Sequence, residues 1–162
     1  MLDKFIPVLH NTNSSQRVAD TARIAFGLGY KTLVISKAVG PAAQIGLPEA
    51  QKLAIRYNAN ITFLSDLSEV IELLQPDVTL VVVPGKYGGA NLSETLSKLS
   101  QRLSEIKKVL LVFGGSEPGL TQKEMKLGEV VHPDGVIEDI GTVGTVAITL
   151  YTVSQTIQAR QV

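Results

Sequence analysis

The chain has no cysteine among its 162 residues, which excludes disulfide bonds, thiolate catalysis and zinc–thiolate sites. It also has no excess of charge of either sign, because fifteen basic residues balance fifteen acidic ones. This balance argues against a protein that holds nucleic acid mainly through a large positive surface, although a local basic patch stays open. The first residues lack a basic stretch followed by a long apolar core, so we expect no signal peptide and a cytoplasmic location.

One long segment, residues 140–159, carries no charge at all. Half of its residues are Gly, Thr, Ser or Gln, which makes it too polar for the hydrocarbon core of a membrane. We therefore expect no membrane contact, and we interpret the segment as a helix that is buried or lies at a subunit interface.

Strand-like and helix-like patterns alternate along the whole chain, and 44% hydrophobic residues are enough for one well-buried domain over residues 1–162. This alternation predicts an α/β fold with a mostly parallel sheet and helices on both faces, and ligands then bind beyond the carboxyl ends of the strands. The predicted strands are 5–9, 32–35, 60–64, 78–83, 109–113 and 130–131; the predicted helices are 15–28, 48–56, 67–74 (capped by Ser65 and Asp66), 93–106, 123–127 and a last one from about 141.

Two glycine-rich segments carry the chemistry that we expect. The loop 114–120 holds three glycines between a buried strand and a helix, so that backbone groups could approach a ligand closely. An ordinary strand-to-helix turn is the alternative, and neither a Walker P-loop nor a dinucleotide fingerprint fits the spacing. Gly141 and Gly144 flank the start of the last helix, which indicates close backbone packing against another segment or a ligand.

These segments resemble the motifs of the SPOUT (SpoU–TrmD) superfamily of RNA methyltransferases. Residues 109–121 look like the second motif, residues 131–151 like the third, and residues 9–34 like the first motif of the SpoU branch. The three occur in the expected order and together cover nearly the whole chain.

The resemblance implies a trefoil knot over roughly residues 80–160, S-adenosyl-L-methionine as cofactor, no metal, and a homodimer built on the knot helices. It implies methylation of a structured RNA (tRNA or rRNA), with a ribose 2′-hydroxyl as one target, and no DNA. The catalytic residues would be Arg17, Asn13 and Glu117. The cofactor-binding residues would be Pro84, Gly85, Phe113, Gly114, Gly115, Ser116, Gly119, Leu120, Gly141, Thr142, Gly144 and Thr145.

The chain departs from the SpoU pattern at three positions. Thr21 stands where SpoU members place an arginine, Ser116 aligns with their glutamate, and Thr142 falls near their asparagine. Two alternatives therefore stay open: a non-catalytic module of the same architecture that binds cofactor or RNA, and an unrelated flavodoxin-like domain that binds a nucleotide.

Both histidines, His10 and His132, lie at the ends of predicted strands. A general-base role is open for each, but the favoured interpretation is a hydrogen-bonded structural histidine. Lys98, Arg102 and the pair 107–108 form a modest basic patch that suits either RNA or a solvated helix face.

Overall fold

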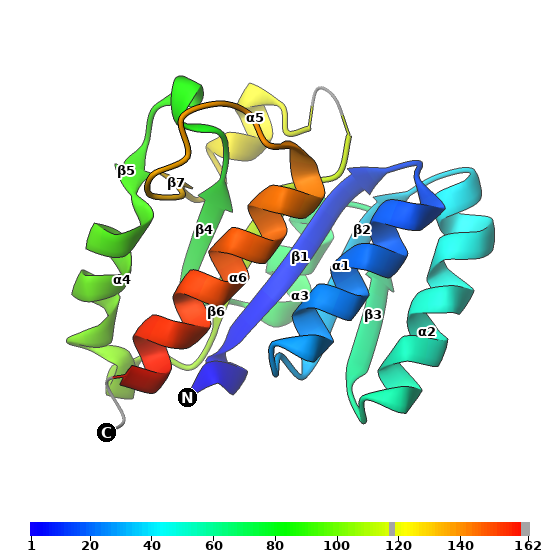
Figure 1. Ribbon diagram of the computed structural model, residues 1–162, viewed down its shortest axis with the longest axis horizontal. Helices are drawn as coiled ribbons and strands as arrows, with labels where there is room; N and C mark the ends of the chain where they lie inside the picture. Colours follow the sequence, from blue (N-terminus) through cyan, green and yellow to red (C-terminus); the bar gives the residue numbers. More distant parts are fainter. Residues whose placement is uncertain (117–118, 160–162) are drawn as a thin grey trace.

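A parallel sheet of seven strands runs through the centre of the molecule (Figure 1). The computed structural model describes residues 1–116 and 119–159. Within them the strand order is β3-β2-β1-β6-β4-β7-β5, and every neighbouring pair is parallel. The strands are β1 (Phe5–Thr12), β2 (Thr32–Ala38), β3 (Asn60–Leu64), β4 (Val78–Val82), β5 (Ala90–Asn91), β6 (Val109–Gly114) and β7 (Glu129–His132).

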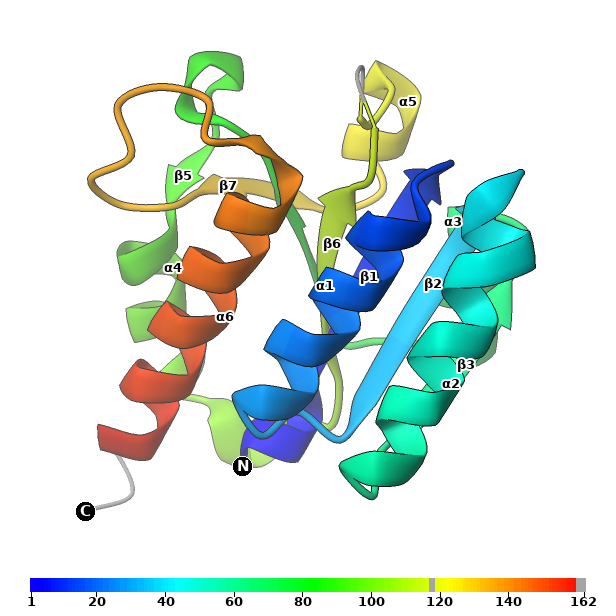
Figure 2. The same ribbon diagram turned by 45° about the vertical axis from the view of Figure 1, so that its right-hand side comes forward.

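Helices cover both faces of this sheet, as Figures 1 and 2 show. On one face lie α1 (Ser15–Gly27), α2 (Leu47–Arg56), α4 (Leu92–Ser100) and α6 (Gly141–Ala159), and on the other lies α3 (Leu67–Leu74). The short α5 (Gln122–Met125) sits beyond the carboxyl end of β6. Single turns complete the chain: η1 (Leu2–Lys4), the π-helical η2 (Ala42–Gly46), η3 (Gly85–Tyr87) and η4 (Leu103–Glu105). The predicted fold class is thus confirmed, whereas the trefoil knot stays a prediction.

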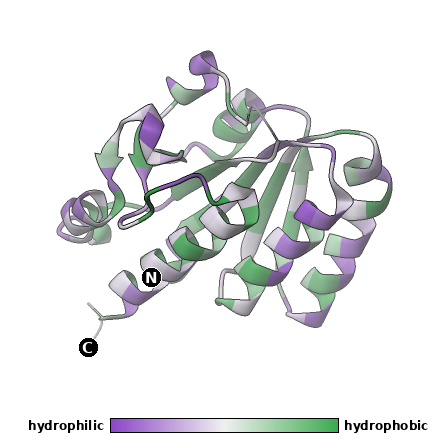
Figure 3. Ribbon diagram, turned by 45° about the horizontal axis from the view of Figure 1, so that its top comes forward, coloured by the Kyte–Doolittle hydropathy of each residue, from purple (hydrophilic) through white to green (hydrophobic). Residues whose placement is uncertain are grey.

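The central strands are apolar throughout because both of their faces are covered. In β1, Phe5 and Leu9 join the larger core under α1 and α6, while Ile6 and Val8 join the smaller core under α3. Figure 3 shows mostly hydrophobic strands, and helices in which hydrophilic and hydrophobic residues alternate. The alternation of side chains along β1 continues to His10, which therefore points to the α3 side.

The uncharged segment 140–159 forms α6 from Gly141 onward. Val146, Leu150 and Val153 bury one face of this helix, while the side chain of Tyr151 is 56% exposed. The buried hydroxyl of Tyr30 donates a hydrogen bond of 2.8 Å to the Leu150 carbonyl and ties α6 to the turn before β2. No helix in the described part of the chain has the length and apolarity that a membrane crossing requires.

One predicted helix differs from the structure, and two short elements were not predicted. The predicted helix 93–106 ends at Ser100, and a 3-10 turn then carries Leu103 back into the core. The two-residue β5 and the π-helical turn η2 were not predicted, because elements this short leave no periodic pattern in the sequence.

Candidate functional site

His10 occupies the carboxyl end of β1, between two neighbouring strands. The sheet register pairs it with Ser36 of β2 and with Gly114 of β6. Its side chain is completely buried, with Nδ1 2.8 Å from Ser36 Oγ and Nε2 2.5 Å from an oxygen of Glu124. A fully buried imidazole with a carboxylate on one side and a hydroxyl on the other is held in one orientation.

Glu124 reaches His10 from α5, where it also closes the start of that helix. Thr121 and Glu124 form a capping box, in which the Thr121 N–H donates to Glu124 Oε1 at 2.9 Å. Oε2 is thereby left to face His10. Burial acts to raise the pKa of Glu124, but the Thr121 N–H and the adjacent His10 outweigh it, so the pKa lies below its usual value. Glu124 is therefore an ionised acceptor at neutral pH.

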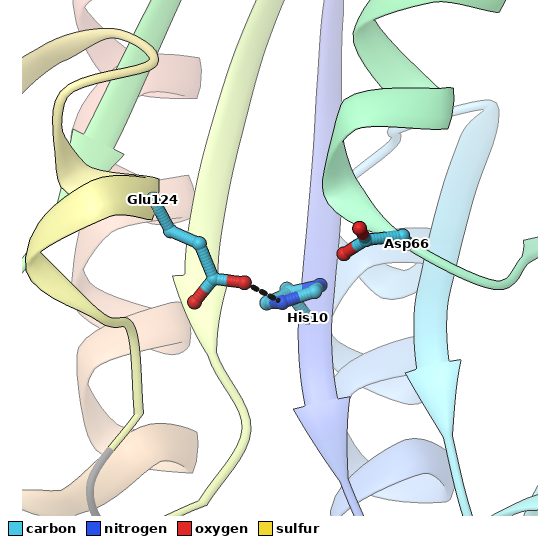
Figure 4. A group of neighbouring side chains, drawn as sticks. All are labelled: His10, Asp66 and Glu124. Atoms are coloured by element: carbon cyan, nitrogen blue, oxygen red, sulfur yellow. Dashed lines mark hydrogen bonds and ion pairs between the residues drawn. The ribbon is translucent and has the colours of Figure 1, made fainter.

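Asp66 completes the group from the third side. It caps α3 by accepting the Leu67 N–H at 2.8 Å, and the Ser68 hydroxyl donates to its other oxygen at 3.3 Å. One ligand atom each from His10, Asp66 and Glu124 lie within 4.8 Å of one another. Figure 4 shows the imidazole between the two carboxylates. We call these three residues the His–Asp–Glu group.

The donor set of this group fits a divalent cation. One imidazole nitrogen and two carboxylates are common ligands of Mn²⁺, Zn²⁺ and related ions. Ligands about 2.2 Å from one ion lie within about 4.4 Å of each other, so a small side-chain movement brings the three into that range. Because Ser36 already occupies Nδ1, only Nε2, which lies 2.5 Å from Glu124, is left on His10 to bind an ion.

A cleft of about 250 Å³ opens at the same edge of the sheet, on the side of α6. The backbone segments after β4 and β6, α5 and the first turn of α6 form its walls. Nine of the twelve residues predicted to bind a cofactor line it. The aromatic Tyr87, the polar Gln122 and Asp139, and the apolar Val82, Val83 and Met125 complete the lining. The nine are Pro84, Phe113, Gly114, Ser116, Gly119, Leu120, Gly141, Thr142 and Thr145.

The glycines of the loop after β6 serve the chain's own packing. A Cβ on Gly115 would lie 2.7 Å from the Thr12 Cβ and 2.9 Å from the Asn11 carbonyl oxygen. A Cβ on Gly114 would lie 2.7 Å from the Gly119 Cα. The close backbone approach that the sequence predicted is therefore between two parts of the loop, and between the loop and the end of β1.

The other predicted residues lie around this edge without lining the cleft. Gly85 is exposed in η3, and Gly144 lies in the first turn of α6. Arg17 donates a hydrogen bond of 2.8 Å from Nη1 to the Gly115 carbonyl, and Asn13 is exposed in the turn before α1. Glu117 lies outside the described residues.

α5 connects the cleft with the His–Asp–Glu group. Gln122 and Met125 line the cleft, while Glu124, between them in sequence, contacts His10. A change in the position of this single turn would therefore alter both places at once.

Sequence reasoning missed Asp66 and Glu124 as ligand candidates and expected no metal. Asp66 caps α3, and Glu124 belongs to the capping box of α5. Such a local role is reason enough for a carboxylate at each position, so the sequence pattern did not single out either residue as a ligand. The position of His10 at the end of a strand was the one feature of the sequence that pointed to this site. In the structure, His10 is buried against the side chains of Ser36 and Glu124.

The backbone closely resembles those of SpoU-type methyltransferases. A candidate methyltransferase of Bordetella pertussis superposes with a TM-score of 0.77 at 16% identity, over 96% of this chain and 97% of that one. The SpoU methyltransferase AviRb of Streptomyces viridochromogenes superposes with a TM-score of 0.74 at 13% identity, over 97% of this chain and 62% of that one. Likeness at such low identity shows the fold alone.

Sequence comparison defines the family. The family model described as RecB-family nuclease (DUF2122) matches residues 40–152. A candidate type II restriction enzyme of Aeropyrum pernix is 39% identical over 146 residues, covering 90% of each chain. Another, of Methanocaldococcus jannaschii, is 33% identical over 157 residues, covering 95% of this chain and 99% of that one. The chain belongs to this family. These relatives and the fold neighbours alike are named as enzymes.

The family corrects the predicted function. The predicted S-adenosylmethionine-dependent RNA methyltransferase is wrong, because the family is described as nucleases and the relatives are named as restriction enzymes. The two alternatives, a non-catalytic module and a flavodoxin-like domain, are corrected by the same finding. The predicted cofactor, S-adenosyl-L-methionine, is corrected as well, because the family and the relatives are named as nucleases and restriction enzymes, and a nuclease reaction consumes water and needs no methyl donor. The predicted nucleic-acid partner, structured RNA with DNA excluded, is corrected by the same relatives, which are named as restriction enzymes. The homodimer stays a prediction.

Proposed function

We propose that the protein is a nuclease that hydrolyses phosphodiester bonds in DNA with a divalent cation held by the His–Asp–Glu group. The observation that carries this proposal is the gathering of His10, Asp66 and Glu124 at the carboxyl edge of the sheet. Membership of a family described as nucleases supports the reaction, and the names of the curated relatives support DNA as the substrate.

A divalent cation at this position supplies two things when bound: charge that stabilises the phosphorane-like transition state and a lowered pKa for an attacking water. The chain's own residues prepare the place for it. Burial fixes the ring of His10, and the two helix caps fix the carboxylates of Asp66 and Glu124. Asp66 is exposed, which leaves the group open to substrate.

Arg17 contributes a fixed positive charge beside this edge. One arm of its guanidinium is held by the Gly115 carbonyl, and the Gly115 N–H in turn donates to the His10 carbonyl at 2.7 Å. Arginine presents further N–H groups in a planar fork that suits phosphate oxygens. We assign Arg17 to the binding of a backbone phosphate of the DNA.

The cleft holds a nucleotide of the substrate in this proposal. Its apolar walls, with Phe113 and the half-exposed ring of Tyr87, suit a base, and Gln122 and Asp139 offer hydrogen-bonding groups for its edge. Because α5 borders both the cleft and the His–Asp–Glu group, a nucleotide there lies near the cation.

The test is cleavage of plasmid and linear DNA by purified protein with Mg²⁺ or Mn²⁺, with EDTA as the control. D66N and E124Q keep side-chain oxygens that can cap their helices while removing the charge. We expect either change to lower the cleavage rate about 100-fold or more, in line with several kcal/mol of metal stabilisation. E72Q, at an exposed carboxylate of α3, is the matched control and should cleave normally. Cleavage that survives EDTA, or D66N and E124Q both acting at the wild-type rate, would overturn the proposal.

A further inference from the structure

We propose that Ser36 is a positioning residue whose hydroxyl lets His10 change its proton-bearing nitrogen in place, so that Nε2 becomes free to bind the cation. This inference rests on the proposed function, since it names the residue that makes His10 a competent ligand.

The geometry brings Ser36 and His10 together as a fixed pair. The parallel register of β1 and β2 sets them directly beside each other on the α3 side of the sheet. Both side chains are completely buried, and the distance from Ser36 Oγ to His10 Nδ1 is 2.8 Å. Within the described residues, the side-chain hydrogen-bond partner of the Ser36 hydroxyl is His10. A hydroxyl so enclosed cannot reach a substrate, so its role is toward the imidazole.

The contacts of His10 require two different proton arrangements. Without a cation, Nε2 lies 2.5 Å from the carboxylate of Glu124. An ionised carboxylate can only accept hydrogen bonds, so Nε2 carries the proton and donates the hydrogen bond. In the neutral ring Nδ1 is then an acceptor, and Ser36 donates. To bind a cation, Nε2 must offer its lone pair, so the proton of the neutral ring sits on Nδ1 and Ser36 accepts.

A hydroxyl is suited to both arrangements because it can donate or accept by rotating about its C–O bond. No heavy atom has to move in the tightly packed layer between β1 and β2. Without the hydroxyl, the cation-bound form would bury an unpartnered N–H on Nδ1, which is costly inside a protein. Partners that fix the second nitrogen of a ligating histidine commonly change metal affinity about 10–100-fold when removed.

The first test is the affinity of the full chain for Mn²⁺, measured by calorimetry. We expect S36A to bind Mn²⁺ about 10–100-fold more weakly than the wild type, and S36T, which keeps the hydroxyl, to bind it normally. T149V is the matched control, because the Thr149 hydroxyl is buried in α6 without a hydrogen-bond partner among the described residues. An S36A affinity equal to that of a Mn²⁺-binding wild type would overturn the role of Ser36 and leave the proposed function intact.

The second test needs no metal. The chain has two histidines, so the imidazole nitrogen resonances of His10 can be assigned by comparison with H132Q. In metal-free protein we expect S36A to shift the Nδ1 resonance of His10 and S36T to leave it unchanged. An unshifted Nδ1 resonance in S36A overturns the inference. A wild type that binds no Mn²⁺, even though this resonance shifts, overturns the proposed function itself.

Discussion

Replacing Gly115 by alanine tests the packing that holds the two strand ends of the site together. The new Cβ would lie 2.7 Å from the Thr12 Cβ and 2.9 Å from the Asn11 carbonyl oxygen, closer than such atoms approach in proteins. Neither neighbour yields easily. The Gly115 N–H donates to the His10 carbonyl at 2.7 Å, and the Ser116 hydroxyl donates to the Asn11 carbonyl at 2.8 Å.

The loop after β6 must therefore move away from β1, and this displacement sets the size of the effect. Overpacking of this kind costs about 1–3 kcal/mol of the free energy of unfolding. In a chain of this length, 1 kcal/mol corresponds to about 2–4 °C in Tm, so we expect G115A to melt about 2–12 °C below the wild type. Because His10 is hydrogen-bonded to the displaced residue, we also expect weaker Mn²⁺ binding.

Differential scanning calorimetry of the metal-free protein measures the first effect. G27A is the matched control, because a Cβ on Gly27 meets nothing within 4 Å and alanine favours the helix α1 by up to about 1 kcal/mol. G27A should melt at or above the wild-type temperature. If G115A melts at the same temperature as G27A, the loop has room for a methyl group. The argument that the loop after β6 is packed rigidly against the end of β1 would then fail.

Three further outcomes follow from the same structure. Y30F loses the hydrogen bond to the Leu150 carbonyl, so urea denaturation should show a free energy of unfolding lower by about 1 kcal/mol. The backbone N–H groups of Lys108 and Lys107 hold the pKa of Asp77 below its usual 3.8; the stability that this carboxylate provides is thus present above pH 3.8 and is lost as the pH falls through the folded-state pKa. D77N should accordingly unfold at lower urea than the wild type at pH 7, and the difference should shrink at pH 3. Saturating Mn²⁺ should raise the Tm, by an amount equivalent to about 2.7 kcal/mol at one hundred times the Kd, and EDTA should reverse the rise.

The sequence predicted most of the fold because its signals are local. Residues 109–113 form an uninterrupted apolar run, as a strand covered on both faces must, and α3 begins and ends where its cap and apolar spacing indicate. Parallel topology follows from the alternation of strands and helices, and it brings the glycine-rich loops to one edge. The lining of the cleft was predictable for this reason.

The His–Asp–Glu group was not predictable in the same way. His10 and Glu124 are 114 residues apart, and their contact depends on β1 lying next to β6, an order that no local pattern encodes. Asp66 reaches the group because α3 begins beyond the end of β3, two strands away from β1. The residues that carried the family resemblance are mostly glycines, prolines and threonines of loops, and these determine the path of the backbone. They therefore predicted the fold correctly and the function wrongly.

The fold resembles methyltransferases, whereas the family is described as nucleases. The two comparisons concern different faces of the same sheet edge. The cleft lies on the α6 side, between the loops after β4 and β6, α5 and the start of α6, and the path of these segments is what a comparison of folds at 13–16% identity measures. The His–Asp–Glu group lies on the α3 side and consists of three side chains, which backbone superposition does not compare. A comparison of backbones can thus match the loops on one face without registering which side chains gather on the opposite face of the same edge. Since α5 borders both places, the proposed function lets the cleft hold part of the substrate of a reaction centred on His10.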